Sequence, residues 1–141
     1  MIHFNRKDVD ELKNVYKINL INSCSGFKSA NLIGTKSNAG TSNVAVFSSV
    51  THFGSNPPLL GVVFRPPTDV PRNTYENIKE TGQFTINHIH SPIIKDAHHT
   101  SAKYDKEVSE FEITNLEEEY KNGWHAPCLL YTSPSPRDTR S

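Results

Sequence analysis

The stretch TSNVAVFSSVTHFGSNPPLLGVVFRPP, residues 41–67, decides the fold expected for this chain. It contains two apolar, β-branched segments, residues 44–51 and 59–64, which are typical of strands. A Gly-Ser-Asn-Pro-Pro connection separates them, and we expect Pro57 and Pro58 to stay out of any sheet ladder because proline lacks a backbone N–H. The stretch therefore predicts two strands joined by a rigid turn.

Further strands are expected on both sides of this stretch. Residues 16–22 alternate polar and apolar side chains, and residues 31–35 are short and apolar, so both segments predict strands of an antiparallel sheet. Residues 36–43 form the loop before the opening strand, and residues 83–88 predict another strand. Many short strands with Gly and Pro between them predict a mainly β fold with short helices, in which helices pack outside a β-barrel.

Short helices are expected in the second half of the chain. Residues 74–79 begin with Thr74, whose hydroxyl can cap backbone N–H groups, and Gly82 ends the segment. A Ser-Pro pair starts a second helix, whose body is residues 93–99. Residues 103–119 are polar with a few spaced apolar side chains, which predicts a helix that turns into a surface strand.

Length and charge bound the kind of protein. The 141 residues fit one domain, and 15 basic residues balance 15 acidic ones, so no nucleic-acid partner is indicated. The longest apolar runs are too short to span a bilayer, and the N-terminus lacks a basic region followed by an apolar one. We therefore expect a cytoplasmic protein without a membrane partner.

The end of the chain needs separate treatment. CLLYTSPSPRD, residues 128–138, resembles the in-frame translation of a transposon-type sequencing adapter. We therefore expect a domain over residues 1–127, and a disordered, non-native extension over residues 128–141 that makes the chain a fragment of a longer protein. A natural disordered tail is the alternative, because such tails are common at chain ends.

Neither metal nor cysteine chemistry is indicated. With residues 128–141 set aside, Cys24 is the only cysteine, so we expect no disulfide or zinc cluster and a small, buried or half-buried residue; a reactive thiol is the alternative. His98 and His99 are adjacent, so on a helix they point about 100° apart. His88 and His90 would share one face of a strand, but no third ligand is evident, and we predict no metal site.

Polar residues in and after the opening stretch favour a bound phosphate. Ser48 and Ser49 end a strand, and Arg65 and Arg72 offer guanidinium groups that suit phosphate oxygens. Thr74 begins a helix, whose free N–H groups attract an anion. Taken alone, the serines would be ordinary strand residues. Their combination with the arginines favours a functional interpretation.

A flat ring is the second part of the expected ligand, which would then be a flavin. Such a ring needs backbone donors at its edge and apolar groups on one face. Small residues at Ser42, Asn43, Val44 and Ala45 would let the backbone approach that edge. Asn87 is a further candidate partner, with a buried structural asparagine as the alternative.

In this order, the segments resemble flavin reductase-like proteins with the FMN-binding split-barrel fold, especially the flavoredoxin-like branch. The resemblance covers roughly residues 15–127, and its strongest points are TSNVAVFSSV, the NPPL turn, RPP, RNTYENI, TGQFTINH and HTSAKYDKEVSEF. It implies FMN as the cofactor, with FAD possible, and NADH or NADPH as the electron donor. It also implies a homodimer with one flavin per subunit near the interface.

Site residues follow from the resemblance by position. The backbone at residues 43–45 would meet the ring, and Ser48 and Ser49 would meet the ribityl chain or the phosphate. The phosphate candidates are Arg65, Arg72 and Thr74. Further contacts to the ring or the nucleotide would come from Asn87 and from the segment Ser101 to Lys103. No catalytic side chain is expected, because hydride transfer to a flavin is the cofactor's own chemistry.

The family continues after a sequence like HAP, residues 125–127, with strands that complete the barrel and much of the dimer contact. We therefore expect an incomplete barrel, and we expect this 141-residue chain to be poorly soluble or flavin-free. The function expected of the parent is that of an NAD(P)H-dependent flavin reductase or a flavoredoxin-like electron carrier. The alternatives are a noncatalytic flavin-binding or storage module, and a structural barrel that binds nothing.

Overall fold

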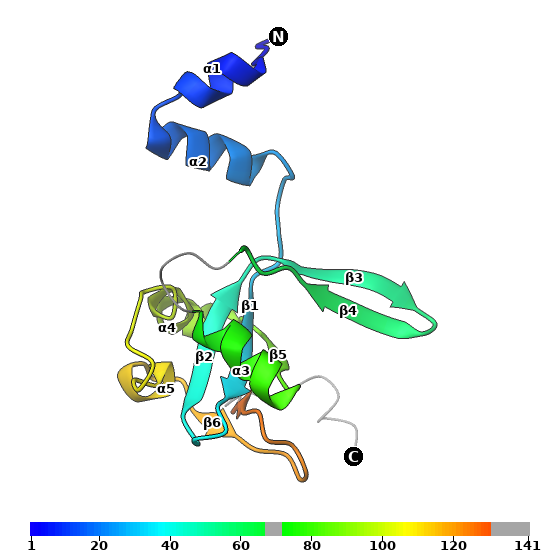
Figure 1. Cartoon of the computed structure of the whole chain (residues 1–141), viewed down its shortest axis with the longest axis vertical. Coiled ribbons are helices and arrows are strands. Elements are labelled where there is room, and N and C mark those ends of the chain that lie inside the picture. Colours follow the sequence, from blue (N-terminus) through cyan, green and yellow to red (C-terminus); the bar gives the residue numbers. More distant parts are fainter. Residues whose placement is uncertain (67–71, 131–141) are drawn as a thin grey trace.

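The computed structural model describes residues 1–66 and 72–130. Helices α1 (Arg6–Glu11) and α2 (Asn14–Ser23) lie apart from the sheets, at the top of Figure 1, and neither has a buried residue. The strand predicted over residues 16–22 is wrong, because these residues lie in α2. An alternating pattern enforces a strand only where one face packs on a core, and here Tyr16 and Ile18 are 55% and 50% exposed.

A three-stranded antiparallel sheet forms the centre of the molecule. It contains β1 (Asn31–Lys36), β2 (Ser42–Phe47) and β5 (Thr85–His88) in the order β2-β1-β5. The strand predicted over residues 31–35 is confirmed as β1, which is buried from Asn31 to Thr35. The strand predicted over residues 83–88 is confirmed for residues 85–88, which form β5. β2 is an edge strand of this sheet, and its outer side faces the helices that follow.

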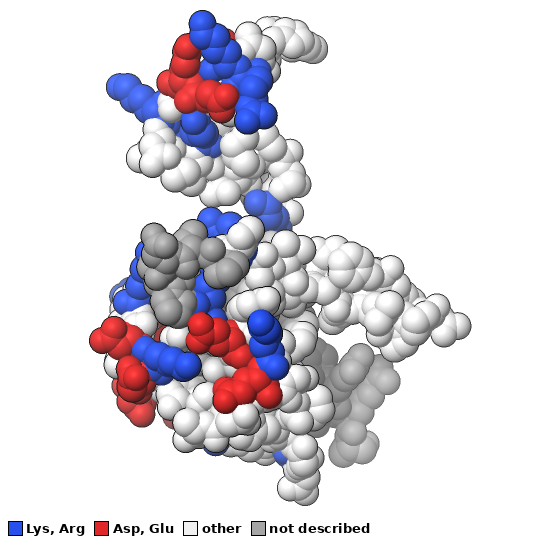
Figure 2. All heavy atoms as spheres, in the orientation of Figure 1, with Lys and Arg blue, Asp and Glu red and all other residues white. Residues whose placement is uncertain are grey.

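A hairpin of β3 (Val50–Ser55) and β4 (Pro58–Val62) projects from the body (Figure 1). The strand predicted over residues 44–51 is divided, since β2 ends at Phe47 before β3 begins. Pro58 pairs with Ser55, so the expectation that both prolines avoid the ladder is wrong for Pro58. The first residue of an outer strand needs no N–H partner. The hairpin lacks Lys, Arg, Asp and Glu and is white in Figure 2.

The helices around the sheet largely follow the predictions. α3 (Asn73–Thr81) ends at Gly82, whose φ of 69° is left-handed and suits glycine. The 3₁₀ turn η1 (Ser91–Ile93) and α4 (Ile94–His99) form the predicted second helix. α5 (Glu110–Ile113) followed by β6 (Glu118–Glu119) matches the helix and surface strand predicted over residues 103–119.

β7 (Cys128–Leu129) pairs with β6 and closes the described part of the chain. Leu129 is 3% exposed and belongs to the core with Leu32, Val44, Ala97 and Leu116. Leu129 thus supplies apolar burial just after the domain end expected at residue 127, and that boundary stays a prediction. The disorder expected farther along, at residues 131–141, lies outside the described residues. Within the described part the strands form three separate sheets and no closed barrel.

Candidate functional site

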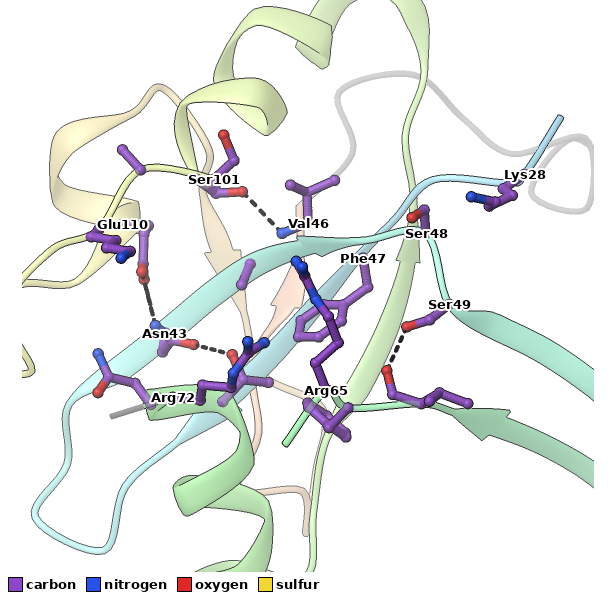
Figure 3. A pocket seen from close by; sticks show the side chains of 18 of the residues that line it. Lys28, Asn43, Val46, Phe47, Ser48, Ser49, Arg65, Arg72, Ser101 and Glu110 are labelled. Carbon is purple, nitrogen blue, oxygen red and sulfur yellow. Dashed lines mark hydrogen bonds between the residues drawn. The ribbon is translucent and has the colours of Figure 1, made fainter. Parts of the chain in front are cut away.

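A cavity of about 930 Å³ lies between β2, the end of β4, the start of α3 and the segment after α4 (Figure 3). It brings together many of the residues that the sequence predicted, namely Asn43, Ala45, Ser48, Ser49, Arg65, Arg72, Thr74, Ser101 and Lys103. Three predicted residues do not line it: Ser42, Val44 and Asn87. The volume falls within the range of pockets that hold drug-sized ligands.

Positive charge dominates the cavity wall. Among the described lining residues, four are cations, Lys28, Arg65, Arg72 and Lys103, and one is a carboxylate, Glu110. None of these cations takes part in the salt bridges found among residues 1–66 and 72–130. Figure 2 shows blue atoms around the upper part of the main body and red atoms mostly below them. The cavity therefore favours an anionic ligand.

Glu110 is buried at 5% exposure and is held by neutral donors. Its two carboxylate oxygens accept from Asn43 Nδ2 at 2.9 and 2.7 Å, and Oε2 also accepts from the backbone N–H of Val44 at 3.2 Å. Burial raises the pKa of Glu110, and the hydrogen bonds from backbone N–H groups and Asn43 oppose that rise. The carboxylate of Glu110 therefore points toward Asn43 and Val44, with which it forms a hydrogen-bond network inside the protein.

Thr74 belongs to the same network. Its hydroxyl donates to Asn43 Oδ1 at 2.8 Å, and the residue is buried. The prediction that Thr74 caps its helix is wrong, because Arg72 occupies the N-cap position and Thr74 lies inside α3. Since its hydroxyl proton is already used, Thr74 can offer a ligand its backbone N–H but not that proton.

The outer edge of β2 is already hydrogen-bonded within the chain. The N–H of Val44 donates to Glu110, and the N–H of Val46 donates to Thr100 Oγ1 at 3.0 Å. Because successive N–H groups point to opposite sides of a strand, the N–H of Ala45 faces β1. Ser42 is also buried, with its hydroxyl 3.1 Å from that of Ser109. The edge proposed for a ring is therefore covered up to residue 46.

Beyond that point the strand opens toward the cavity. Ser48 is exposed, and its side chain makes no hydrogen bond to another described residue, whereas the hydroxyl of Ser49 donates to Val63 O at 2.8 Å. Phe47 and Phe64 form an edge-to-face pair with centroids 5.2 Å apart, and both line the cavity. These rings give the site the apolar surface that a flat ligand needs.

Asn87 lies inside the sheet. Its amide donates to Leu32 O at 3.1 Å and to Thr85 Oγ1 at 3.0 Å, and its carbonyl oxygen accepts from the N–H of Leu129 at 3.0 Å. These bonds account for its polar groups, which agrees with the alternative of a buried structural asparagine.

The remaining expectations concern cysteine chemistry, metal binding and membrane spans. Cys24 is exposed, so the expectation of a buried or half-buried cysteine is wrong; α2 has no core to bury it against. No group of three or more potential metal ligands occurs among the residues that the structure describes. A search of the same residues also finds no helix long and apolar enough to cross a membrane.

Sequence reasoning missed several lining residues, including Phe27, Lys28, Phe47, Phe64, Thr100 and Glu110. Glu110 stands in a charged stretch that would normally face solvent, so composition gives no sign of its burial. The apolar run that contains Phe64 indicated a buried strand and did not indicate a cavity wall.

Comparison with solved structures defines the fold. A candidate flavin reductase with a split-barrel domain from Shewanella frigidimarina NCIMB 400 is 48% identical, with a TM-score of 0.85 over 92% of this chain and 63% of that chain. Flavoredoxin of Desulfovibrio vulgaris (Miyazaki F) is 22% identical, with a TM-score of 0.63 over 72% of this chain and 54% of its own. The predicted split-barrel fold class is confirmed.

The family follows from a sequence comparison. The model of the flavin reductase like domain matches residues 25–132, and this chain belongs to that family. An uncharacterized protein of Halalkalibacterium halodurans, BH2278, is 33% identical over 109 residues, which are 77% of this chain and 49% of that protein. The chain thus spans about half of this relative and under two thirds of the Shewanella structure.

Proposed function

We propose that this chain is the flavin-binding part of an NAD(P)H-dependent flavin reductase or of a flavoredoxin-like electron transfer protein that uses FMN. The observation that carries the proposal is one cavity that combines cations outside the salt bridges of the described residues with hydroxyl groups and aromatic rings, within a flavin reductase-like domain. We further propose a homodimeric, cytoplasmic parent protein. FAD is the alternative flavin.

The phosphate would lie at the start of α3. Among the described residues no side chain caps this helix, so its first backbone N–H groups can meet an anion. Arg72 stands at the N-cap, and Asn73 and Thr74 also line the cavity. Arg65, which is exposed after β4 and also lines the cavity, would supply a second guanidinium group.

The ring would lie against the apolar part of the wall, where Phe47 and Phe64 meet. When bound, the flavin supplies the hydride acceptor, and the task of the protein is to hold and orient it. Glu110 is directed to Asn43 and Val44, and therefore we assign it no proton transfer. Ser48 is the hydroxyl best placed to contact a polar chain between ring and phosphate, since its side chain is exposed on this wall.

The test is a titration with FMN, followed by its fluorescence, on this chain and on a longer form in which residues 1–130 are joined to the remaining part of the Shewanella protein. We expect Arg72→Ala to weaken FMN binding about tenfold or more, since charge-assisted hydrogen bonds are the strong ones. Arg6→Ala is the matched control, because Arg6 lies on α1 outside the cavity and pairs with Asp10.

Riboflavin and reduced nicotinamide separate the remaining possibilities. Riboflavin lacks the phosphate, so Arg72→Ala should leave its binding unchanged. Oxidation of NADH or NADPH with added FMN supports the reductase, whereas FMN binding without such oxidation leaves the noncatalytic module. No binding of FMN by either form of the protein would show that the proposal is wrong.

A further inference from the structure

Phe27 is an aromatic side chain that no part of the described core accounts for. It lies in SCSGFKSA, residues 23–30, a small and polar segment that links α2 to β1 (Figure 1). The side chain is fully exposed, and the ring pairs found among the described residues do not include it. A large apolar group in this state gains stability when something covers it.

This linking segment reaches the candidate site. Asn22, Gly26, Phe27 and Lys28 line the same cavity as β2 and α3, although they precede β1 in the chain. Gly26 has a φ of 74°, and its N–H donates to Ser23 O at 3.0 Å, so the chain turns immediately before Phe27. Lys28 Nζ donates to Asn22 O at 2.8 Å, which ties the two sides of that turn together.

The position of Phe27 suits a flat aromatic partner. The cavity wall also contains the Phe47 and Phe64 rings, which pack on each other and, among the described ring pairs, not on Phe27. A flat ligand in the cavity would therefore meet aromatic surface from Phe47 of β2 and from Phe64, which follows β4, and further such surface from Phe27 in the segment before β1. Aromatic side chains prefer offset-stacked or edge-to-face contacts with other planar rings.

We propose that Phe27 contacts the isoalloxazine ring of the flavin and helps to select a flat, tricyclic ligand for the cavity. The inference rests on the proposed function and extends it to a segment outside the motifs that suggested it. Arg72 and Phe27 then recognise different parts of one ligand, the phosphate and the ring.

The first test compares two ligands and two phenylalanines in the longer form of the protein. Phe27→Ala should raise the dissociation constants of FMN and riboflavin by the same factor, about tenfold, since both contain the ring. Phe53→Ala is the matched control: Phe53 is 67% exposed on the hairpin and does not line the cavity. It should change neither constant.

Fluorescence quenching tests whether residue 27 lies close to the flavin, which a purely structural role of Phe27 would not require. In a Trp124→Phe background, Phe27→Trp should give tryptophan fluorescence that bound riboflavin quenches strongly, and Phe53→Trp should give much weaker quenching. Equal quenching in the two variants, or unchanged flavin binding in Phe27→Ala, overturns the inference while the proposed function stands.

Other outcomes are equally decisive. If Phe27→Ala raises only the KM for NADH or NADPH, the side chain covers the nicotinamide, and the assignment to the flavin ring is wrong. If it changes only the association state, the side chain covers a second copy of the chain, and the assignment is also wrong. If the wild-type protein binds no flavin, the inference and the proposed function fail together.

Discussion

Removal of the Glu110 side chain is the most direct test of the network behind the cavity. In Glu110→Ala the amide of Asn43 and the backbone N–H of Val44 lose their acceptor, and both lie in a buried region. The side chain of Asn43 has no other described acceptor for its N–H groups, and its carbonyl oxygen is fixed by Thr74. The variant therefore leaves buried donors without partners.

The size of the effect follows from two opposing terms. Each buried donor left without a partner costs about 1–3 kcal/mol, so two such donors suggest about 2–6 kcal/mol. Removal of a buried carboxylate recovers part of the desolvation that raises its pKa, so we expect a net loss near the middle of this range, about 3 kcal/mol. For a domain of this size that corresponds to a fall in Tm of about 10 °C.

Thermal and urea unfolding followed by circular dichroism measure this loss. Glu112→Ala is the matched control, because Glu112 is exposed on the same short helix, and its effect should stay within about 0.5 kcal/mol. Equal stabilities of the two variants would refute the argument, since the network would then contribute nothing beyond an exposed glutamate.

The same residue predicts a dependence on pH. Because the pKa of Glu110 is raised in the folded protein, the folded state holds its proton at pH values where the unfolded chain has released it. Stability should therefore fall as pH rises from about 4.5, the ordinary value, to the raised pKa, and it should be level above that. Glu110→Gln should remove this contribution, which the difference between the two unfolding curves across pH reports.

Three further changes test the packing around the sheet by urea unfolding. Gly34→Ala should cost about 1–3 kcal/mol, because its new Cβ would overlap the carbonyl oxygen of Pro127, and more than Gly54→Ala, where the nearest atom is 3.3 Å away. Asn87→Ala should cost about 2–4 kcal/mol, since a buried N–H of β7 and a carbonyl of β1 lose their partner; a cost below 1 kcal/mol would contradict this. Thr100→Val should cost about 1–2 kcal/mol, because the backbone N–H of Val46 on the outer edge of β2 loses its acceptor. An unchanged stability would show that water replaces the hydroxyl.

Sequence patterns predicted the helices and strands that are determined by neighbouring residues alone. β1 is a short segment that is buried from Asn31 to Thr35, and Gly82 ends α3 because glycine adopts a left-handed φ at no steric cost. The segment 16–22 shows the limit of such signals. Its alternating pattern favours a strand, but no core covers it in the structure, and the backbone satisfies its hydrogen bonds as a helix.

The part of the candidate site that could be predicted consists of residues whose type alone indicates their ligand. Arg65 and Arg72 were expected near a phosphate, and the structure brings both to one cavity. Hydrogen bonding among distant residues was not predictable. Asn43 and Glu110 are 67 positions apart, and nothing in either segment indicates that the carboxylate covers the strand edge that a ligand was expected to use.

Buried polar side chains join the sheet to α3 and α5, where apolar side chains could also have been buried. Asn43 on β2 bonds to Thr74 on α3 and to Glu110 on α5, and Thr35 on β1 accepts from Asn77 on α3 at 3.1 Å. Apolar contacts would bury these elements equally well but would let a short helix slide, whereas hydrogen bonds fix its position and direction. The start of α3 must keep its position if it is to hold a phosphate, and these bonds fix α3 at two points, Thr74 in its first turn and Asn77 in its middle.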